Sequence, residues 1–383
     1  MKIHFYTESF KPYLSGVTVS VDTFSRGLTE LGNEVTVVAP SYPGFKDTDP
    51  YKVWRFPSLG TPLYPGFRLA WPFKRGHKTY LKHNRPDIIH SHSPYQLGYL
   101  SQHIAKKLKV PFVYHFHTLF TDYLHFVPLP RFISAPVLKF IIRDFCKGCD
   151  LIITPTAVVK DVLHKEYGVT QRVEVLPTGV EDAAVAAANP RGIREKYNIA
   201  ADAPLLMYCG RASKEKNIEF LLKAFQKIVA LIPATRLMIV AFGPHEAALK
   251  TLAARLGVAD KVIFTGRVER EQVYNYLKAG DLFVCASKTE TQGLVLSEAK
   301  ACGRPAVAID ARGVSQMVEN GVDGWLVPDD VAIFTRKVVE TLNNPLELKR
   351  LSEGADRNAK AHFLNSAVAK KLEALYKELY NKA

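Results

Sequence analysis

The stretch that most constrains how this chain folds is residues 280–305, GDLFVCASKTETQGLVLSEAKACGRP. Its apolar run Leu282–Ala286 predicts a short buried strand, and a polar loop follows over residues 287–292. After Gly293, apolar residues recur at the spacing of a buried helix through LVLSEAKAC. A strand that passes through one loop into a helix is the repeating element of α/β folds, so we expect such a fold here.

Two carboxylates, Glu290 and Glu298, flank the start of this predicted helix with seven residues between them. A helix N-terminus attracts anions because its first backbone N–H groups have no partner within the helix. A glutamate beside a bound diphosphate is therefore expected to hold neutral hydroxyl groups. Taken singly, each residue could equally be a helix-capping acid or a solvated surface glutamate.

The first residues of the chain predict another unit of this kind. Residues 3–7 and 34–39 read as strands, and a helix of roughly residues 17–31 lies between them. Ser15 and Gly16 stand at the entry to that helix. The loop TESFKPYLSGVTVS holds a single glycine, so the glycine-rich dinucleotide fingerprint is absent. Further strands of this first half are expected at residues 88–90, 109–115, 151–155 and 173–176.

A third unit begins after Pro204, where LLMYCGRASKEKNIEFLLKAF reads as a strand, a basic loop and a helix. The strand is expected over Leu205–Cys209 and leads into Gly210 and Arg211, and Asn217 is expected to cap the helix that begins at Ile218. Arg211 and Lys216 therefore lie at the carboxyl end of a strand, where open α/β sheets bind ligands. A guanidinium and an ammonium group there suit a diphosphate, although either cation alone would ordinarily be a surface residue.

These blocks together resemble the family-four retaining glycosyltransferases, nucleotide-sugar enzymes of the GT-B fold. The resemblance rests on the E-x7-E of residues 290–298, on PTGVE at 177–181 and on GRASKEKN at 210–217, and it covers essentially the whole chain. One departure is AFGP at residues 241–244, where the family usually has G-x-G-P. The resemblance implies an α/β chain of two Rossmann-like domains that face each other across a cleft, with a C-terminal helix crossing back to the first domain.

The same resemblance sets the expected domain boundaries and donor-site residues. It implies that Arg211 and Lys216 clamp the leaving diphosphate, that Glu290 holds the sugar hydroxyls and that Glu298 holds the ribose. The expected domains are an acceptor-side domain over residues 1–178, a linker over 179–194, a nucleotide-sugar-binding domain over 195–362 and the returning helix over 363–383. The other donor-binding residues implied are Gly16 beside a phosphate, Val268 beside the nucleobase, and Gly293, Leu294 and Val295 at the helix start.

The segment PFVYHFHTLFTDYLHFVP, residues 111–128, resembles a narrower group, the diacylglycerol glucosyltransferases and related lipid mannosyltransferases. In that group the histidine of F-H-T lines the sugar pocket, and His117 is the matching residue. Asp122, Tyr123 and His125 match less specifically. The resemblance implies transfer of glucose or mannose from a nucleoside-diphosphate sugar to a membrane lipid such as diacylglycerol. A soluble sugar or polysaccharide acceptor, or a non-catalytic anion-binding protein, remains open.

The formal net charge of +14 predicts an anionic partner. No nucleic-acid-binding motif is present, so a nucleotide sugar and an anionic membrane surface are the expected partners. Between Asp49 and Asp87 the chain carries basic and aromatic residues without an acid, a composition that suits an anionic membrane. A solvated helix face with its aromatics in the core is the alternative. The residues we assign to the acceptor and membrane side are Trp71, Lys74, Arg75, Lys78, Lys82, Arg85 and Tyr123.

Two further features bear on location and cofactors. The first residues enter a strand directly and lack a signal-peptide core. The apolar runs are too short and too often broken by charge to span a membrane. We therefore expect a cytoplasmic protein that associates peripherally with the membrane. The apolar segment 126–145 reads as a core helix or as an element grazing the bilayer. The histidine pairs at 90/92 and 115/117 lack a carboxylate or cysteine cluster, and the pair Asp47-x-Asp49 reads as surface. We therefore predict no metal requirement.

Overall fold

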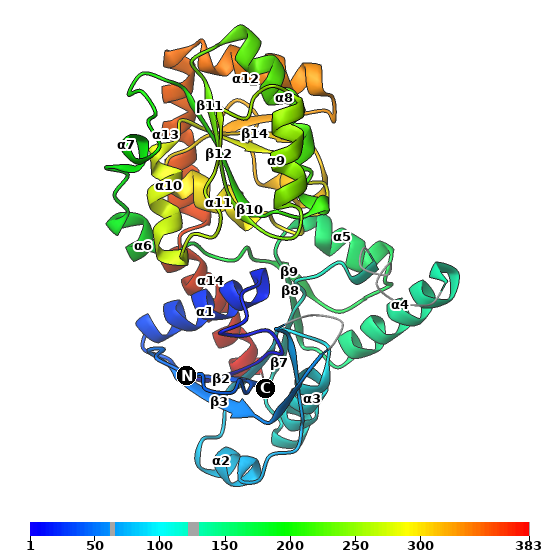
Figure 1. Ribbon diagram of the computed structural model, residues 1–383. Helices are drawn as coiled ribbons and strands as arrows, with labels where there is room; N and C mark the ends of the chain where they lie inside the picture. The colour runs from blue at the N-terminus through cyan, green and yellow to red at the C-terminus, as the bar shows by residue number, and fades with distance from the viewer. Residues whose placement is uncertain (62–65, 122–129, 383) are drawn as a thin grey trace. The chain divides into compact units, whose positions relative to one another are not determined.

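The computed structural model describes residues 1–61, 66–121 and 130–382, which form two compact units (Figure 1). Unit 1 comprises residues 1–179 together with the C-terminal residues from 365 onward, and unit 2 comprises residues 180–364. Each unit contains one main sheet of parallel strands with helices packed against both faces. The predicted α/β fold with two Rossmann-like domains is confirmed.

Unit 1 is built on a seven-stranded parallel sheet in the order β3-β2-β1-β6-β7-β8-β9. Its strands are β1 (Lys2–Tyr6), β2 (Glu34–Pro40), β3 (Lys52–Phe56), β6 (Ile88–Ser91), β7 (Phe112–His115), β8 (Leu151–Thr154) and β9 (Val173–Val175). A separate antiparallel pair consists of β4 (Ser58–Gly60) and β5 (Arg68–Ala70). The described helices are α1 (Gly16–Glu30), α2 (His77–His83), α3 (Gln96–Leu108), α4 (Arg131–Lys147), α5 (Ala157–Lys165) and α14 (Asn365–Lys382).

Unit 2 is built on a six-stranded parallel sheet in the order β12-β11-β10-β13-β14-β15. Its strands are β10 (Leu205–Arg211), β11 (Arg236–Phe242), β12 (Val262–Phe264), β13 (Leu282–Cys285), β14 (Ala306–Ile309) and β15 (Gly324–Val327). Its α-helices are α6 (Asp182–Ala187), α7 (Ile193–Lys196), α8 (Ile218–Leu231), α9 (Glu246–Arg255), α10 (Val273–Ala279), α11 (Leu294–Ala301), α12 (Val331–Leu342) and α13 (Pro345–His362). Short 3₁₀ turns are η2 (Lys214–Lys216), η3 (Arg270–Gln272) and η4 (Arg312–Gln316).

Successive residues of the central strands enter two different hydrophobic cores, because side chains alternate between the faces of a sheet. In unit 1, Val37 and Ile88 belong to the core under α1 and α14, whereas Val38 and Ile89 belong to the core under α3, α4 and α5. A parallel sheet needs this cover on both faces, which explains why the strands read as short, wholly apolar runs.

Helix α14 completes unit 1 although it comes from the far end of the sequence. Val368, Leu372 and Tyr376 are fully buried in the core that they share with α1. The side-chain amide of Asn365 donates to the carbonyl oxygen of Thr23 at 2.8 Å, which fixes the first turn of α14 against α1. The predicted return of the C-terminal helix to the first domain is therefore confirmed, with the helix starting at Asn365 instead of residue 363.

The segment predicted as a linker, residues 179–194, lies almost entirely within unit 2. It contains α6 and the start of α7. Val180 is buried in the unit 2 core, and its N–H donates to the carbonyl oxygen of Phe363 at 2.7 Å. The alanine-rich sequence DAAVAA favours a helix through its intrinsic propensity but carries little hydrophobic period, which is why the sequence pattern suggested a linker.

Both sheets contain a point at which the chain changes the direction in which it adds strands. In unit 1 this point lies between β1 and β6, where Phe5 pairs with His90. In unit 2 it lies between β10 and β13, where Leu206 pairs with Leu282. The loops that leave two such strands turn to opposite faces of the sheet, and the crevice between them is where open α/β sheets bind ligands.

Glu8 joins the two loops at this point of unit 1. Its carboxylate, which is 1% exposed, accepts hydrogen bonds from the backbone N–H of Leu97 (2.6 Å) and from the hydroxyl of Ser93. Leu97 lies in the first turn of α3, so one acid anchors both the loop after β1 and the helix after β6. Burial raises the pKa of Glu8 to about 7, against the lowering effect of those hydrogen bonds.

We predict that Glu8→Gln changes the pH dependence of stability. Because the pKa of Glu8 is higher in the folded protein than in the unfolded chain, its protonated form contributes stability that is complete below about pH 4.5 and is lost as pH rises through about 7. The variant lacks this titration, so its free energy of unfolding should increase relative to that of the parent as pH rises from 5 to 8, by on the order of 3 kcal/mol in total. Its melting temperature should rise relative to the parent over the same range. Calorimetry of both proteins at several pH values measures the difference, and a pH-independent gap would contradict the prediction.

Candidate active site

The switch point of unit 2 brings together two of the predicted donor-site residues. Lys216 ends the loop after β10, and Glu290 lies in the loop after β13. The Nζ of Lys216 donates to Oε1 of Glu290 at 2.5 Å, and both side chains are about four-fifths buried, at 23% and 17% exposed. The pairing of adjacent strands thus places side chains 74 residues apart in direct contact. A lysine held in this way offers a fixed positive charge to an anionic ligand.

Arg211 is the last residue of β10 and is exposed at the same edge of the sheet. Its side chain makes no ion pair with another residue in the described part of the chain. On the other side of the switch point, Gly293 has a φ of 83° and begins α11, a conformation that favours glycine. Leu294 and Val295 follow it half-buried in the first turn. The backbone N–H groups of this first turn are an anion site in general terms.

The loop around Glu290 is held by close backbone packing against η4. A Cβ on Gly313 would lie 2.6 Å from the carbonyl oxygen of Glu290 and 2.3 Å from that of Thr291. The N–H of Gly313 donates to the Glu290 carbonyl at 3.1 Å. Only glycine fits this approach, so Gly313 fixes the backbone that presents the Glu290 carboxylate.

Glu298 differs from Glu290 in its surroundings, because it is 2% exposed and forms an ion pair with Arg270. Burial disfavours the charge of Arg270, but the Glu298 carboxylate and Tyr274 outweigh that effect and raise the pKa of Arg270 above its usual value. The sequence reading missed Arg270. Its signal was a cation in the loop that follows β12, two residues after Val268, which lies half-buried beside the unit 2 core.

In unit 1, Gly16 is exposed at the first position of α1. Ser15 caps the helix, and its hydroxyl accepts from the N–H of Thr18 at 3.1 Å. The hydroxyl oxygens of Ser9 and Ser15 are 2.6 Å apart and share a hydrogen bond, so short polar side chains connect the loop after β1 to the start of the helix. This arrangement leaves the backbone of Gly16 accessible at the carboxyl edge of the sheet.

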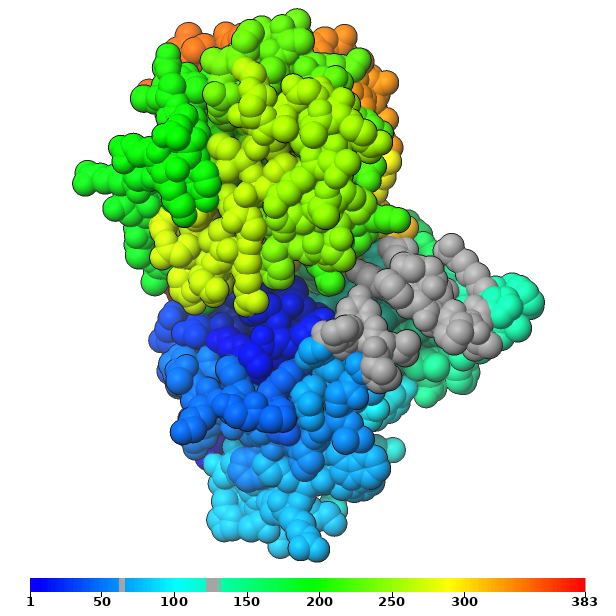
Figure 2. Space-filling view, in the orientation of Figure 1, coloured from blue at the N-terminus to red at the C-terminus, as the bar shows by residue number. Residues whose placement is uncertain are grey.

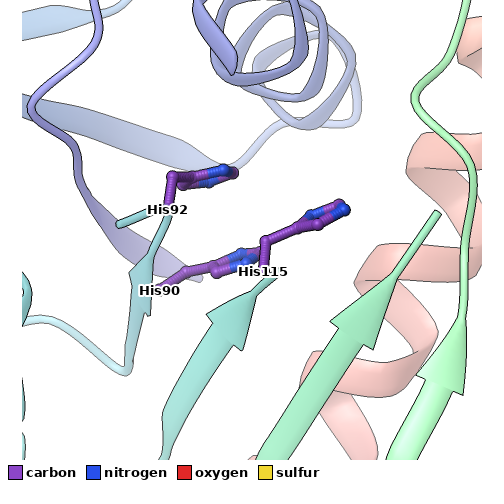
Figure 3. Close-up of side chains that lie close together, drawn as sticks. All are labelled: His90, His92 and His115. Carbon is purple, nitrogen blue, oxygen red and sulfur yellow. The ribbon is translucent and has the colours of Figure 1, made fainter. Parts of the chain in front are cut away.

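His117 lies just after β7 and is partly buried. Burial lowers the pKa of His117 to about 3, so its ring is neutral near pH 7. Nε2 of His117 and Nδ1 of His92 are 2.9 Å apart and share a hydrogen bond. The predicted histidine pairs converge, because His90 lies in β6, His92 directly follows it, and His115 ends the adjacent β7 (Figure 3). One ring nitrogen from each of His90, His92 and His115 lies within 4.8 Å of the others, a closeness that the sequence alone did not show.

The acid pair read as surface forms ion pairs in the structure. Asp49 binds Lys11 at 2.6 Å, and Asp47 binds Arg55 at 2.5 Å. Both carboxylates are therefore neutralised by cations of unit 1. Cys146 and Cys149, the C-x-x-C pair, are buried, and burial raises the pKa of Cys146 to about 12. A protonated, buried thiol is a poor metal ligand.

The basic segment 71–85 is only partly helical. Helix α2 spans only His77–His83, so Lys74 and Arg75 precede it and Arg85 follows it. The ammonium of Lys74 lies 4.2 Å from the centre of the Trp54 ring and donates to a backbone carbonyl, which removes Lys74 from the exposed set. The predicted residues of this set that the structure places on the surface are Trp71, Arg75, Lys78, Lys82 and Arg85. Tyr123, Asp122 and His125 lie outside the described residues.

Helix α4 presents the largest run of exposed apolar side chains in the described chain. Phe132 is 78% exposed and Phe140 is 66% exposed. The whole set recurs at helical spacing and comprises Phe132, Ile133, Val137, Phe140 and Ile141. The opposite side of α4 enters the core through Ile142, Phe145 and Cys146. Segment 126–145 was predicted as a core helix or as an element grazing the bilayer, and its described part has one side in the core and one exposed apolar side. Residues 126–129 lie outside the described residues. No described helix is long and apolar enough to cross a membrane.

Comparison with known families assigns both units. Residues 14–184 match the family described as Glycosyltransferase Family 4, and residues 191–358 match the family described as Glycosyl transferases group 1. An alpha-monoglucosyldiacylglycerol synthase of Streptococcus pneumoniae is 33% identical over 337 residues, which cover 85% of this chain and 75% of the relative. The enzyme of the same name from Acholeplasma laidlawii is 29% identical, with 100% of this chain and 98% of the relative covered.

Solved structures share the fold over the full length. The sucrose-phosphate synthase of Thermosynechococcus elongatus superposes with a TM-score of 0.79 at 20% identity, and each chain is covered completely. Anabaena HepE in complex with UDP also gives a TM-score of 0.79, at 19% identity, with 99% of this chain and 100% of HepE covered. These likenesses establish the architecture of the two units. Both family matches and the Streptococcus relative show that this chain belongs to the family-four glycosyltransferases, enzymes of the GT-B fold.

Proposed function

We propose that this glycosyltransferase moves a hexose, glucose or mannose, from a nucleoside-diphosphate sugar to a membrane lipid such as diacylglycerol, with retention of anomeric configuration. The observation that carries the donor side is the meeting of Lys216 and Glu290 beside Arg211 and the start of α11, at the switch point of unit 2. The names of the two relatives above, both diacylglycerol glycosyltransferases, support the acceptor side.

In the proposed donor site, cations bind the diphosphate and carboxylates bind the hydroxyl groups. In the proposal, Arg211 and Lys216 bind the diphosphate, and the first turn of α11 at Gly293 adds backbone N–H donors. Glu290 accepts hydrogen bonds from sugar hydroxyls, and its ion pair with Lys216 holds its carboxylate in place beside the phosphates. Glu298, fixed by Arg270, takes the ribose hydroxyls, and Val268 contacts the nucleobase. UDP is the ligand of the HepE neighbour, which favours a uridine nucleotide.

The reaction proposed is a front-side displacement. The bond between the anomeric carbon and the diphosphate oxygen breaks while the acceptor hydroxyl oxygen bonds to the same face of that carbon. The acceptor proton passes to the departing phosphate oxygen. The negative charge that develops on the diphosphate is where Arg211 and Lys216 act, because fixed cations lower the energy of a developing anion. His117 contacts the sugar as a neutral ring and adds no positive charge beside the anomeric carbon.

A radiolabelled-sugar assay with diacylglycerol vesicles and either UDP-glucose or GDP-mannose tests the reaction. We expect labelled glycolipid with one donor, and its anomeric configuration by NMR should match that of the donor sugar. Label found only in water-soluble products would point to a soluble acceptor instead. Absence of turnover with every donor, in a protein that still binds nucleotide, would favour a non-catalytic anion-binding role.

The diphosphate clamp is tested by the double substitution Arg211→Ala, Lys216→Ala. Each charge-assisted hydrogen bond contributes about 1.5–3 kcal/mol, so kcat/KM should fall by a factor of roughly 10²–10⁴. Lys214→Ala is the matched control, since Lys214 is an exposed lysine in the same loop. Full turnover in the double variant, or an equal loss in the control, would refute the clamp.

We predict that the transfer needs no divalent metal. The cations Arg211 and Lys216 take the place of a metal on the diphosphate in the proposed site, and the acid pair Asp47 and Asp49 is already neutralised by Arg55 and Lys11. Turnover in excess EDTA should equal turnover without it. A loss that added Mg²⁺ or Mn²⁺ restores would show that the prediction is wrong.

The acceptor side is proposed to dock on an anionic membrane through two surfaces of unit 1. One is the exposed apolar face of α4, Phe132 to Ile141, flanked by Lys139 and Arg143. The other is the exposed basic and aromatic segment around α2, with Trp71 at 56% exposed. In Figure 2 the teal α4 and the light-blue α2 segment both lie at the surface of unit 1. Apolar side chains with neighbouring cations are the composition that binds anionic lipid interfaces.

Sedimentation with vesicles tests this docking. The parent should bind vesicles that contain anionic phosphatidylglycerol. The double variant Phe132→Asp, Phe140→Asp should weaken binding by at least about tenfold, because two exposed aromatic side chains that would enter the lipid interface are lost. Leu346→Asp, on the 82%-exposed leucine of α13, is the matched control and should bind like the parent. Equal binding of all three proteins, or none to any vesicle, would exclude α4 as the docking face.

A further inference from the structure

The four histidines of unit 1 form an ordered group of neutral rings. His90 and His92 stack face to face with ring centres 4.4 Å apart, and His115 and His117 stack at 4.1 Å. His90, His92 and His115 are essentially fully buried. Burial is the main cause that lowers the pKa of each of the four imidazoles, so all are uncharged near pH 7. Each ring therefore carries one N–H donor and one acceptor nitrogen.

These stacked rings are not arranged as metal ligands. A histidine binds a metal through a lone pair in the plane of its ring, about 2.0–2.1 Å from the ion. Because His90 and His92 lie face to face with their planes 23° apart, their lone pairs run side by side. No single ion can accept both unless a ring turns. The arrangement is better explained by hydrogen bonds that fix the orientation and the tautomers of the rings.

Two hydrogen bonds tie the group to its surroundings. Nδ1 of His90 and the hydroxyl of Tyr376 in α14 are in contact at 2.5 Å, which anchors the inner end. Nδ1 of His92 bonds Nε2 of His117 at 2.9 Å at the outer end. The Nε2 atoms of His90 and His92 and both nitrogens of His115 are buried without a hydrogen-bond partner among the described residues.

Nε2 of His92 has no hydrogen-bond partner among the described residues, and this indicates which ring donates in the bond between His92 and His117. If His117 donated from Nε2, His92 would carry its own proton on Nε2, where a buried N–H would have no partner. If His92 donates from Nδ1, its Nε2 is a bare acceptor instead. Buried N–H groups without a partner are rarer than acceptors without one, so the second arrangement is favoured. His117 then holds its proton on Nδ1.

We propose that His92 is a positioning residue that fixes the tautomer of His117, so that His117 presents an Nδ1–H donor to a hydroxyl oxygen of the bound sugar. This inference rests on the proposed function only for the identity of the ligand. A neutral donor of fixed orientation can bind a sugar oxygen without placing a full positive charge beside an anomeric carbon that becomes positive in the transition state. His90 and Tyr376 hold the stack in place from the core side.

The tautomer can be read without any activity assay. Long-range proton–nitrogen NMR spectra of protein with ¹⁵N-labelled histidine distinguish a protonated ring nitrogen from a bare one. In the parent we expect His117 to show a protonated Nδ1 and a bare Nε2. His92→Asn places a side-chain amide donor near the position of Nδ1 and should keep that pattern, whereas His92→Phe keeps the aromatic ring but should yield a mixture of tautomers.

Kinetics then separate a positioning role from a structural one. We expect His92→Phe to lower kcat by about 10–100-fold with little change in KM for the donor, and His92→Asn to stay within ~3-fold of the parent. His115→Phe is the matched control, since His115 is an equally buried member of the stack whose nitrogens bond no described residue. It should leave the His117 spectrum unchanged, and melting temperatures verify that each variant folds.

Three results would overturn the proposal. The first is a parent His117 with its proton on Nε2, and the second is an unaltered His117 spectrum in His92→Phe. The third is stoichiometric zinc, nickel or copper in purified protein that disappears in His92→Phe, which would make the group a metal site. If no donor is turned over by the parent, the proposed function fails while the spectra still decide the tautomer.

Discussion

The pairing of β1 with β6 and of β10 with β13 is the constraint on which the rest of this structure depends. Each pair joins strands that the chain reaches by going in opposite directions across the sheet, so the loops that leave them diverge. Several residues of the proposed site lie on these loops. Glu8 and His92 follow β1 and β6, and Lys216 and Glu290 follow β10 and β13.

The buried polar side chains near the two switch points differ in charge. Unit 2 pairs opposite charges, as in Lys216 with Glu290, and in Lys300 with Asp323, which are 2.9 Å apart and almost wholly buried. Unit 1 has such pairs too, as in Lys11 with Asp49, but at its switch point burial keeps His92 and His117 neutral and raises the pKa of Glu8. A site of fixed charges suits a diphosphate, and a neutral, hydrogen-bonding site suits sugar hydroxyls.

Much of this protein was predictable because its signals are local. Short apolar strands, single loops and amphipathic helices determined the two parallel sheets, and β10, β13 and α11 lie within a residue or two of their expected bounds. Prediction failed where the local signal was weak. Helix α6 was predicted as a linker because alanine carries little hydrophobic contrast. Lys74 was assigned to the acceptor and membrane side, but its ammonium group packs on the Trp54 ring. Arg270 was missed, since its ion pair with Glu298 crosses from one loop to another helix.

The sequence by itself determined which residue types stand at the carboxyl ends of the strands, because strand, loop and helix follow one another along the chain. It identified Arg211 and Lys216 as candidates for that reason, and the family resemblance added Glu290 and His117. Only the tertiary structure decided which of them meet and in what state of charge, since contacts between loops 74 residues apart and the burial that lowers the pKa of His117 depend on how the strands pair. The outward apolar face of α4 was decided in the same way, because a helix's hydrophobic residues become a core or a surface only when its neighbours are in place.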